Sequence, residues 1–244
     1  MEVPKSHPRK ASLDVRHKLT EGFKKGLVAS AGLIAHGRGE AFDYLLGERT
    51  RVQAVKAQKA ASIALLLAKN PVISVNGNTA ALVSRELVEL ARLTGALLEI
   101  NLFYRTKKRE TLIAKALKKA GARKVYGLSK KYKIPSLTSQ RSYVDEAIWK
   151  ADVVFVPLED GDRTEALKRM GKTVIAVDLN PLSRTAHKAD ITIVDNVVRA
   201  VPNMIKFAKQ MKKADERKLN SLVKRFDNKR NLMVMEKLIR RSLV

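Results

Sequence analysis

The sequence predicts an α/β fold with a doubly wound, mostly parallel sheet of about six strands, N-terminal helices and a C-terminal helical arm. Short runs rich in valine and isoleucine recur from residue 72 onward, and helical stretches separate them. The runs show little polar alternation, which is typical of parallel strands buried on both faces. Capping residues and glycines bound the helical stretches, so strand and helix alternate along the chain.

Helices are predicted first, within residues 1–70. Three segments carry this prediction, residues 12–25, 38–46 and 50–70. The third segment is long and rich in alanine. Pro71 ends it, because a proline disfavours helical backbone in the residue before it.

Six buried strands with connecting helices are predicted next. The strands are residues 72–75, 96–100, 124–127, 152–156, 173–177 and 191–194. Thr79 is expected to cap the helix after the first strand, and Gly95 to end it. Thr106 and Gly121 are expected to bound the next helix in the same way, and residues 128–141 to form a loop or insertion.

The chain divides into three parts in this prediction. Residues 1–70 are a helical segment packed on the main domain, residues 71–204 are the α/β domain, and residues 205–244 are a basic helical arm. A chain of 244 residues buries about 70% of its unfolded surface, so no disulfide or metal is needed for folding.

The composition excludes several classes of protein. The chain has no cysteine, which rules out a disulfide framework, a thiolate nucleophile and Cys-based zinc or iron–sulfur sites. No two of the four histidines lie three to five residues apart, so a local His metal motif is absent. The sequence has neither an apolar run of 18 residues nor the apolar core of a signal peptide at its start. A cytoplasmic protein with no membrane partner is therefore expected.

The net charge of +25 is concentrated in two stretches. Residues 104–133 carry +11 and residues 205–244 carry +9, whereas residues 134–204 carry −1. Such a balance suggests anionic partners, namely nucleic acid, a membrane surface or phosphorylated small molecules, unless it marks solvated helix faces only. Scattered aromatic residues offer no stacking platform for single-stranded nucleic acid, which is therefore disfavoured.

Polar residues follow five of the predicted strands, at the edge where ligands bind in open parallel sheets. They are Asn76 and Asn78; Asn101 and Arg105; Glu159, Asp160, Asp162 and Arg163; Asp178, Asn180, Arg184 and Thr185; and Asp195 and Asn196. Turns favour such residues for capping in any case. Because amides, carboxylates and arginines collect at one edge, we nevertheless predict a site for a polar ligand.

If the ligand at this edge carries phosphate, a P-loop does not bind it. No G-x-x-x-x-G-K-[ST] occurs, and Gly37-Arg38-Gly39 lacks both a third glycine and a preceding strand. Arginines, hydroxyls and helix N-termini then have to hold phosphate. The candidates are Arg38, Arg163 and Arg184 with Thr185 for phosphate, and Asp178 and Asn180 for ribose or adenine. His36 is a candidate for a direct role, although a lone histidine is more often structural.

Several of these residues belong to longer motifs. The motifs are His7-Pro8-Arg9, GLIAHGRGEAFDYLLGE (32–48), PVISVNGN (71–78), NLFYRT (101–106), PLEDGDR (157–163), DLNPLSRTA (178–186) and IVDN (193–196). In this order they closely resemble the archaeal phosphopantothenate synthetases, the 4-phosphopantoate–β-alanine ligases. The resemblance extends from about residue 6 to residue 204, roughly four-fifths of the chain, and leaves out the basic arm.

The resemblance implies a Rossmann-like homodimeric ligase of coenzyme A biosynthesis. Such an enzyme joins 4-phosphopantoate and β-alanine at the expense of ATP and releases 4′-phosphopantothenate, AMP and diphosphate. By motif, ATP binding would involve Arg16, Arg38, Asp178, Leu179, Asn180, Arg184, Thr185, Asn196 and Val197. Arg38, His36 and Arg184 are the candidates for a catalytic role.

The residues suit this chemistry. A carboxylate must be activated before an amine attacks it, and adenylation does so without a protein nucleophile. Alignment and cations on the phosphates would then supply the catalysis. Magnesium is expected with ATP, and its candidate ligands are Asp160, Asp162 and Asp195.

The other two substrates have candidate ligands at the same edge. Arg105, or Arg9 with His7, is a candidate for the phosphate of phosphopantoate, and Asn76, Asn78 and Asn101 are candidates for its hydroxyl and carboxylate. Glu40 or Glu159 is the candidate acceptor for the ammonium of β-alanine.

Two other classes of function stay open at this point. A nucleic-acid-binding protein would show an affinity that falls steeply with salt. A nucleotide-binding or sugar-phosphate-sensing protein on the same fold would bind ATP without turnover, because a fold does not fix a function.

Overall fold

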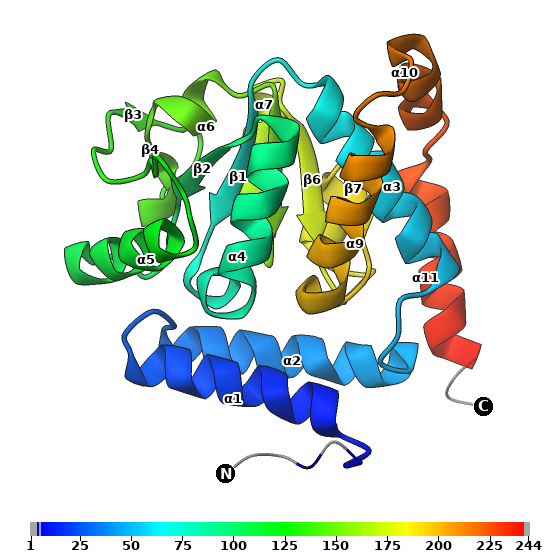
Figure 1. Ribbon diagram of the computed structural model, residues 1–244, viewed down its shortest axis with the longest axis horizontal. Coiled ribbons are helices and arrows are strands. Elements are labelled where there is room, and N and C mark those ends of the chain that lie inside the picture. The colour runs from blue at the N-terminus through cyan, green and yellow to red at the C-terminus, as the bar shows by residue number, and fades with distance from the viewer. Residues whose placement is uncertain (1–3, 5, 242–244) are drawn as a thin grey trace.

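A five-stranded parallel sheet forms the centre of the computed structural model, which describes residue 4 and residues 6–241 (Figure 1). The strands lie in the order β2-β1-β5-β6-β7. Their bounds are β1 (Pro71–Val75), β2 (Leu97–Ile100), β5 (Val153–Pro157), β6 (Thr173–Val177) and β7 (Ile191–Ile193). The predicted α/β class with a parallel sheet and flanking helices is confirmed.

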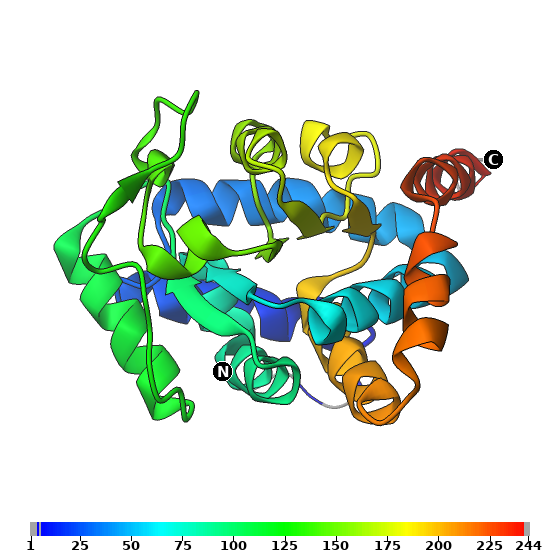
Figure 2. The same ribbon diagram turned by 90° about the horizontal axis from the view of Figure 1, so that it is seen from above.

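Helices cover both faces of the sheet (Figure 2). One face packs on α3 (Val52–Leu67), α4 (Gly77–Thr94) and α9 (Val197–Met211). The other carries α6 (Glu146–Lys150), α7 (Gly161–Arg169) and α8 (Arg184–Lys188). Alternate strand residues enter the two cores, as Val174 and Ile175 do on β6. Burial on both faces explains why the strands lack polar alternation.

Two antiparallel helices, α1 (Lys10–Lys24) and α2 (Ser30–Leu46), lie across the carboxyl end of the sheet (Figure 1). The sequence predicts only residues 38–46 of α2, because glycines at 32, 37 and 39 lower its helix propensity. Packing over the sheet outweighs that preference, and the helix begins eight residues earlier. This position makes α2 a cover for whatever binds at the strand ends.

The remaining helices flank the sheet. α5 (Lys107–Lys119) lies beyond β2, α10 (Glu216–Lys224) packs on α3, and α11 (Asn228–Arg241) contacts β7 (Figure 2). Apolar residues of α11 pack with Leu46 and Leu179. The predicted division into three parts stays a prediction. Its two ends include residues 1–3, 5 and 242–244, which lie outside the described residues. Within the described part of the chain, no helix combines the length and apolarity that a membrane crossing requires.

The third of the six predicted strands, residues 124–127, is not a strand of the sheet in the described chain. Tyr126 forms a single parallel bridge with Glu99, and Gly127 then turns the chain away with a φ of +100°. Asp145 accepts from the backbone amides of Gly127 at 2.6 Å and Leu128 at 3.0 Å. These amides are therefore not available to a neighbouring strand, and the sheet stops at β2 on this side.

The segment after Gly127 is an insertion, as predicted, with some regular structure of its own. It contains β3 (Tyr132–Lys133), a short 3-10 helix η1 (Gln140–Ser142) and β4 (Tyr143–Val144), and β3 pairs antiparallel with β4. Ile134 and Leu137 enter the second core, which anchors the insertion.

The caps of two helices differ in how well the sequence predicts them. Thr106 caps α5 as predicted, since its side chain accepts from the Arg109 amide. Thr79 does not cap α4, because Asn76 occupies that position and accepts from the Thr79 amide. The Thr79 hydroxyl oxygen instead accepts from the Asn76 amide at 3.0 Å, so the two residues form a capping box.

The strand order reverses at β1. The chain passes from β1 outward to β2, and it then returns to the other side of β1 with β5. The connections therefore leave β1 and β5 in opposite directions and open a crevice at their carboxyl ends. This crevice is the expected ligand position in an open α/β sheet.

Candidate active site

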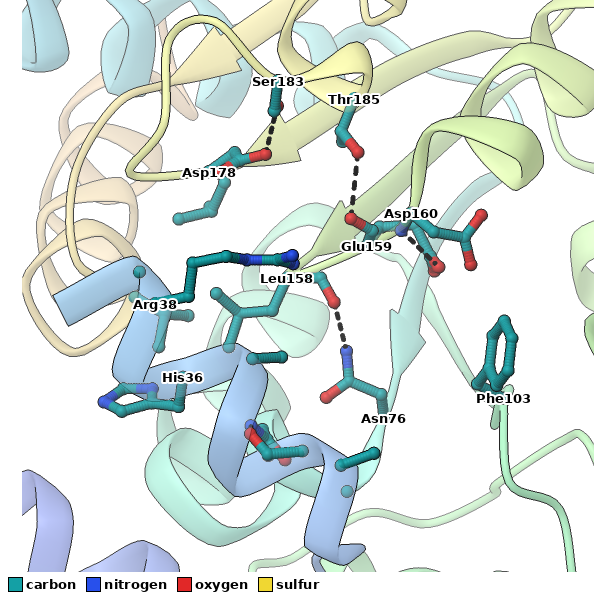
Figure 3. A pocket seen from close by; sticks show the side chains of 18 of the residues that line it. His36, Arg38, Asn76, Phe103, Leu158, Glu159, Asp160, Asp178, Ser183 and Thr185 are labelled. Atoms are coloured by element: carbon teal, nitrogen blue, oxygen red, sulfur yellow. Dashed lines mark hydrogen bonds between the residues drawn. The ribbon is translucent and has the colours of Figure 1, made fainter. Parts of the chain in front are cut away.

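A cavity of about 650 Å³ opens at this crevice, between α2 and the loops that follow β1, β2, β5, β6 and β7 (Figure 3). Its volume lies in the usual range of small-molecule sites. The structure brings most of the predicted residues to its wall: His36, Arg38, Asn76, Asn78, Glu159, Asp160, Asp178, Leu179, Asn180, Arg184, Thr185, Asn196 and Val197. These come from five separate segments of the chain, and only the fold brings them together.

Other predicted residues do not line this cavity. They are His7, Arg9, Arg16, Glu40, Asn101, Arg105, Asp162, Arg163 and Asp195. Asp162 lines a smaller neighbouring pocket together with Arg184. The roles predicted for all these residues stay predictions.

The loop after β6 presents a buried carboxylate. Asp178 accepts from the Asn180 amide at 2.9 Å and from the hydroxyl of Ser183 (Figure 3). Burial raises the pKa of Asp178, and the nearby Arg38 partly opposes this effect. Because a carboxylate oxygen has more than one lone pair, Asp178 can still accept from a ribose hydroxyl or an amino group.

Two polar residues of α2, His36 and Arg38, line the cavity, but their side chains leave the helix in different directions. Figure 3 shows Arg38 extending between Asp178 and Leu158, whereas His36 leaves the helix in another direction. Burial lowers the pKa of His36, so its imidazole is neutral at pH 7. A neutral imidazole can accept a proton, and Arg38 supplies a positive charge.

Arg184 lies at the rim of the cavity in an exposed ion-pair network. It pairs with Asp162 and with Glu165, the latter at 2.6 Å. The hydrogen bonds from Arg184 and Lys188 hold the pKa of Glu165 at about 2. Exposed pairs of this kind contribute little to stability, so Arg184 can exchange a carboxylate for a phosphate at small cost.

An acidic corner follows β5. Glu159 pairs with the buried Arg163, and Asp160 accepts from Arg141 at 2.7 Å. Burial lowers the pKa of both arginines to about 10, so they stay protonated at neutral pH. Two carboxylates held by two buried arginines give this corner a fixed geometry.

The three predicted amides have structural partners. Asn76 donates to the carbonyls of Pro157 at 2.9 Å and Leu158 at 3.1 Å, and so ties β1 to β5 across the crevice. Asn78 donates to Gly32 on α2 at 2.8 Å. Asn101 donates to two carbonyls of the insertion, away from the cavity. These contacts position the wall of the cavity, whatever else the amides bind.

Arg16 and Arg105 are both engaged elsewhere. Arg16 donates to Glu40 at 2.9 Å on the outer side of α2, and its side chain is 45% exposed. Arg105 is 3% exposed and pairs with Glu110 at 2.7 Å. Neither guanidinium reaches the cavity in this structure.

Among the wall residues that the sequence did not single out, four carry aromatic or charged side chains that face the strand ends of β1, β2 and β5 or the insertion beside them. They are Phe103, Tyr104, Arg109 and Arg141. Phe103 and Tyr104 lie inside the motif NLFYRT, so motif position was a signal for them. Arg141 lies in the insertion and Arg109 on a lysine-rich helix, and nothing in the local sequence separates Arg109 from its exposed neighbours.

The carboxylates differ in how well they fit magnesium. No group of three or more His, Asp or Glu side chains with metal-binding geometry occurs within residue 4 and residues 6–241. Asp195 is fully buried and accepts from Thr50 at 2.7 Å and Gln58 at 2.8 Å, outside the cavity. Asp160 lines the cavity and is the candidate that fits the single-carboxylate mode in which Mg²⁺ joins nucleotide phosphates.

Comparisons with known proteins find matches that cover most of the chain. A family model described as phosphopantothenate/pantothenate synthetase matches residues 53–242. The chain is 58% identical over 234 residues to the 4-phosphopantoate--beta-alanine ligase of Thermococcus onnurineus (strain NA1), covering 95% of this chain and 90% of that protein. It is 52% identical over 231 residues to the protein of the same name from Methanosarcina mazei (strain Goe1), covering 95% and 91%.

Proposed function

The chain belongs to the phosphopantothenate/pantothenate synthetase family and acts as a 4-phosphopantoate–β-alanine ligase of coenzyme A biosynthesis, and we propose that it works by adenylating the pantoate carboxylate in this cavity. The observation that carries the proposal is the convergence of eight of the nine motif residues for ATP on one cavity. Arg16 is the ninth, and it lies outside.

The first step activates the acid. The carboxylate of 4-phosphopantoate attacks the α-phosphorus of ATP, an acyl–phosphate bond forms, and diphosphate leaves. The β-alanine amine then attacks the acyl carbon of the adenylate and AMP leaves, so an amide forms with no protein nucleophile. Catalysis in this scheme comes from alignment of the three substrates and from cations on the phosphates.

The nucleotide is proposed to bind at the β6 and β7 end. Asp178 and Asn180 would accept from ribose or adenine. The hydroxyl of Thr185, on the wall of the same cavity, donates to the Glu159 carbonyl at 2.9 Å. Arg38 and Arg184 would hold the triphosphate as charge-assisted donors. Support comes from their common position on the wall and from the exposed, exchangeable pairs of Arg184.

The ammonium of β-alanine is proposed to bind at the acidic corner of Glu159 and Asp160. It must lose a proton before it attacks, and the neutral His36, which lines the cavity from α2, is the proposed acceptor. Mg²⁺ would be held by Asp160 together with the phosphates, and when bound it would neutralise charge on the triphosphate.

Isotope transfer tests the adenylate directly. The purified protein is incubated with ATP, β-alanine and 4-phosphopantoate labelled with ¹⁸O in its carboxylate, and the products are separated by mass spectrometry. One ¹⁸O in AMP, released in step with 4′-phosphopantothenate, is the expected result. ADP with ¹⁸O in inorganic phosphate would show an acyl-phosphate route instead.

Homodimerisation and a cytoplasmic location stay predictions. Light scattering of the purified chain at several concentrations measures the first, and a mass near twice 27.2 kDa is expected.

A further inference from the structure

Four arginines line the cavity, and their charges are balanced in different ways. Arg141 pairs with Asp160, and Arg184 pairs with Asp162 and Glu165. Arg38 lies beside Asp178, at the end proposed for the nucleotide. Arg109 differs, because backbone carbonyls rather than carboxylates are its partners in the described chain.

Two contacts hold the Arg109 side chain. Its Nη2 donates to the carbonyl of Leu27 at 3.0 Å, and its Nη1 donates to the carbonyl of Tyr104. Its Nε is buried and has no hydrogen-bond partner among the described residues. Burial lowers the pKa of Arg109 and no carboxylate opposes the shift, yet a guanidinium stays charged at neutral pH.

A half-buried cation without a counter-ion is costly unless an anion joins it. Carbonyl oxygens satisfy donors but carry only partial negative charge. The fixed fork of Arg109 therefore suits an anionic ligand, since a guanidinium matches the oxygens of a phosphate in geometry and charge.

The first turn of α4 lies against the same guanidinium. A Cβ atom on Gly77 would lie 2.7 Å from Nη2 of Arg109, so the backbone of α4 approaches the charge closely. α4 has 18 residues, and the positive end of its dipole points into the cavity at Gly77 and Asn78. The helix end adds to the positive potential that Arg109 creates.

The sheet order separates this place from the nucleotide loops. Arg109 contacts Tyr104, which follows β2, and lies against Gly77, which follows β1, whereas Asp178 follows β6. β1 and β6 are two strands apart, which corresponds to about 10 Å. 4-Phosphopantoate has its carboxylate and its phosphate at opposite ends of a short chain, so its phosphate must point away from the nucleotide when its carboxylate faces the α-phosphorus.

We propose that Arg109, with the N-terminal turn of α4, binds the phosphate of 4-phosphopantoate. This assignment rests on the proposed binding of the nucleotide at the other end of the cavity. Arg109 would then replace Arg105, the candidate from the sequence, as the ligand of this phosphate. Arg105 is 3% exposed and paired with Glu110. Phe103 and Tyr104 then border the substrate between its two charged ends.

Steady-state kinetics of Arg109→Gln test the proposal. The glutamine removes the charge and keeps an amide donor on a shorter side chain. The KM for 4-phosphopantoate is expected to rise about 10- to 100-fold, the range of one charge-assisted contact, with the KM values for ATP and β-alanine changing less than about threefold. The preference for 4-phosphopantoate over unphosphorylated pantoate is expected to shrink by the same factor.

Lys108→Gln is the matched control. It removes one positive charge from the adjacent exposed position of α5, which does not line the cavity. Its KM values and its preference for the phosphorylated acid are expected to equal those of the unaltered chain. An equal effect in both variants would show long-range electrostatics rather than a contact, and would overturn the proposal.

The outcomes separate this inference from the proposed function. If Arg109→Gln raises the KM for ATP and leaves the preference over pantoate intact, Arg109 contacts the nucleotide and the inference is wrong. If the unaltered chain makes no 4′-phosphopantothenate, the proposed mechanism fails, and titration calorimetry with 4-phosphopantoate then tests Arg109 by affinity alone. If the variant does not fold, a crystal structure of the unaltered chain with 4-phosphopantoate decides: phosphate on Arg109 supports the inference, and phosphate on Arg38 or Arg184 overturns it.

Discussion

Replacing Asn76 with alanine tests whether its side chain holds the crevice together. Asn76 caps α4 through the Thr79 amide at 3.0 Å and donates to the carbonyls of Pro157 and Leu158. Leu158 has a φ of +58°, which is uncommon for a residue with a side chain. The Asn76 amide therefore also stabilises a strained turn at the wall of the cavity.

The expected loss of stability follows from these three contacts. Removal of an N-cap costs about 1 kcal/mol. Two carbonyls that lose their donor add about 1–3 kcal/mol, because a buried acceptor without a partner keeps its desolvation penalty. The sum is about 2–4 kcal/mol, which corresponds to a fall in Tm of roughly 5–15 °C for a chain of this size.

Guanidinium unfolding and differential scanning calorimetry measure this effect. Asn76→Ser is the informative companion, because serine keeps the cap but does not reach Pro157, so it should recover about 1 kcal/mol. Asn78→Ala is the matched control at the next amide of the wall. It removes one hydrogen bond, to Gly32, and is expected to cost about 1 kcal/mol.

The competing prediction from the sequence is that Asn76 binds substrate. A variant with unchanged Tm and a raised KM for 4-phosphopantoate would support that role and refute the structural account. Lower stability together with a lower kcat is the result expected here, since release of Leu158 moves the neighbouring Glu159 and Asp160.

Three further predictions concern the site, pH and packing. Arg184→Ala is expected to raise the KM for ATP or lower kcat by about 10- to 100-fold, because a charge-assisted phosphate contact contributes about 1.5–3 kcal/mol, and unaltered kinetics would remove Arg184 from the triphosphate. Burial raises the pKa of Glu99 to about 7 from 4.5, so the folded chain binds the proton more tightly; stability relative to Glu99→Gln should fall by about 3 kcal/mol as pH rises from 4.5 to 7, and a constant difference in denaturation midpoint would contradict this. Gly77→Ala places a Cβ atom 2.3 Å from the Leu27 carbonyl, so a loss of about 1–3 kcal/mol is expected by calorimetry, and an unchanged Tm would show that the turn gives way freely.

The fold was largely predictable because it depends on patterns that are local in the sequence. Buried parallel strands need continuous apolar runs, and five of the six predicted strands are present. The failure at residues 124–127 has a physical cause. Val125 and Tyr126 are suitable for a strand, but Asp145, 18 residues after Gly127, accepts from the amides that a neighbour would need.

The candidate site was predictable in its residue types and less so in their roles. Polar residues at strand ends predicted its position, because parallel strands bring their carboxyl ends to one edge. The partners of those residues were not predictable. Arg105 and Asp195 resemble ligands in the sequence but have buried structural partners, and Arg109 resembles an ordinary surface arginine but lines the cavity.

The sequence alone determined the α/β class, the edge that carries the site and, through its motifs, the family. Periodicity and turn chemistry suffice for these properties, since they act over a few residues. Tertiary structure alone decided which charges are neutralised by carboxylates and which remain for a ligand. That balance depends on contacts between segments such as α5 and the turn before α2, which no local pattern encodes.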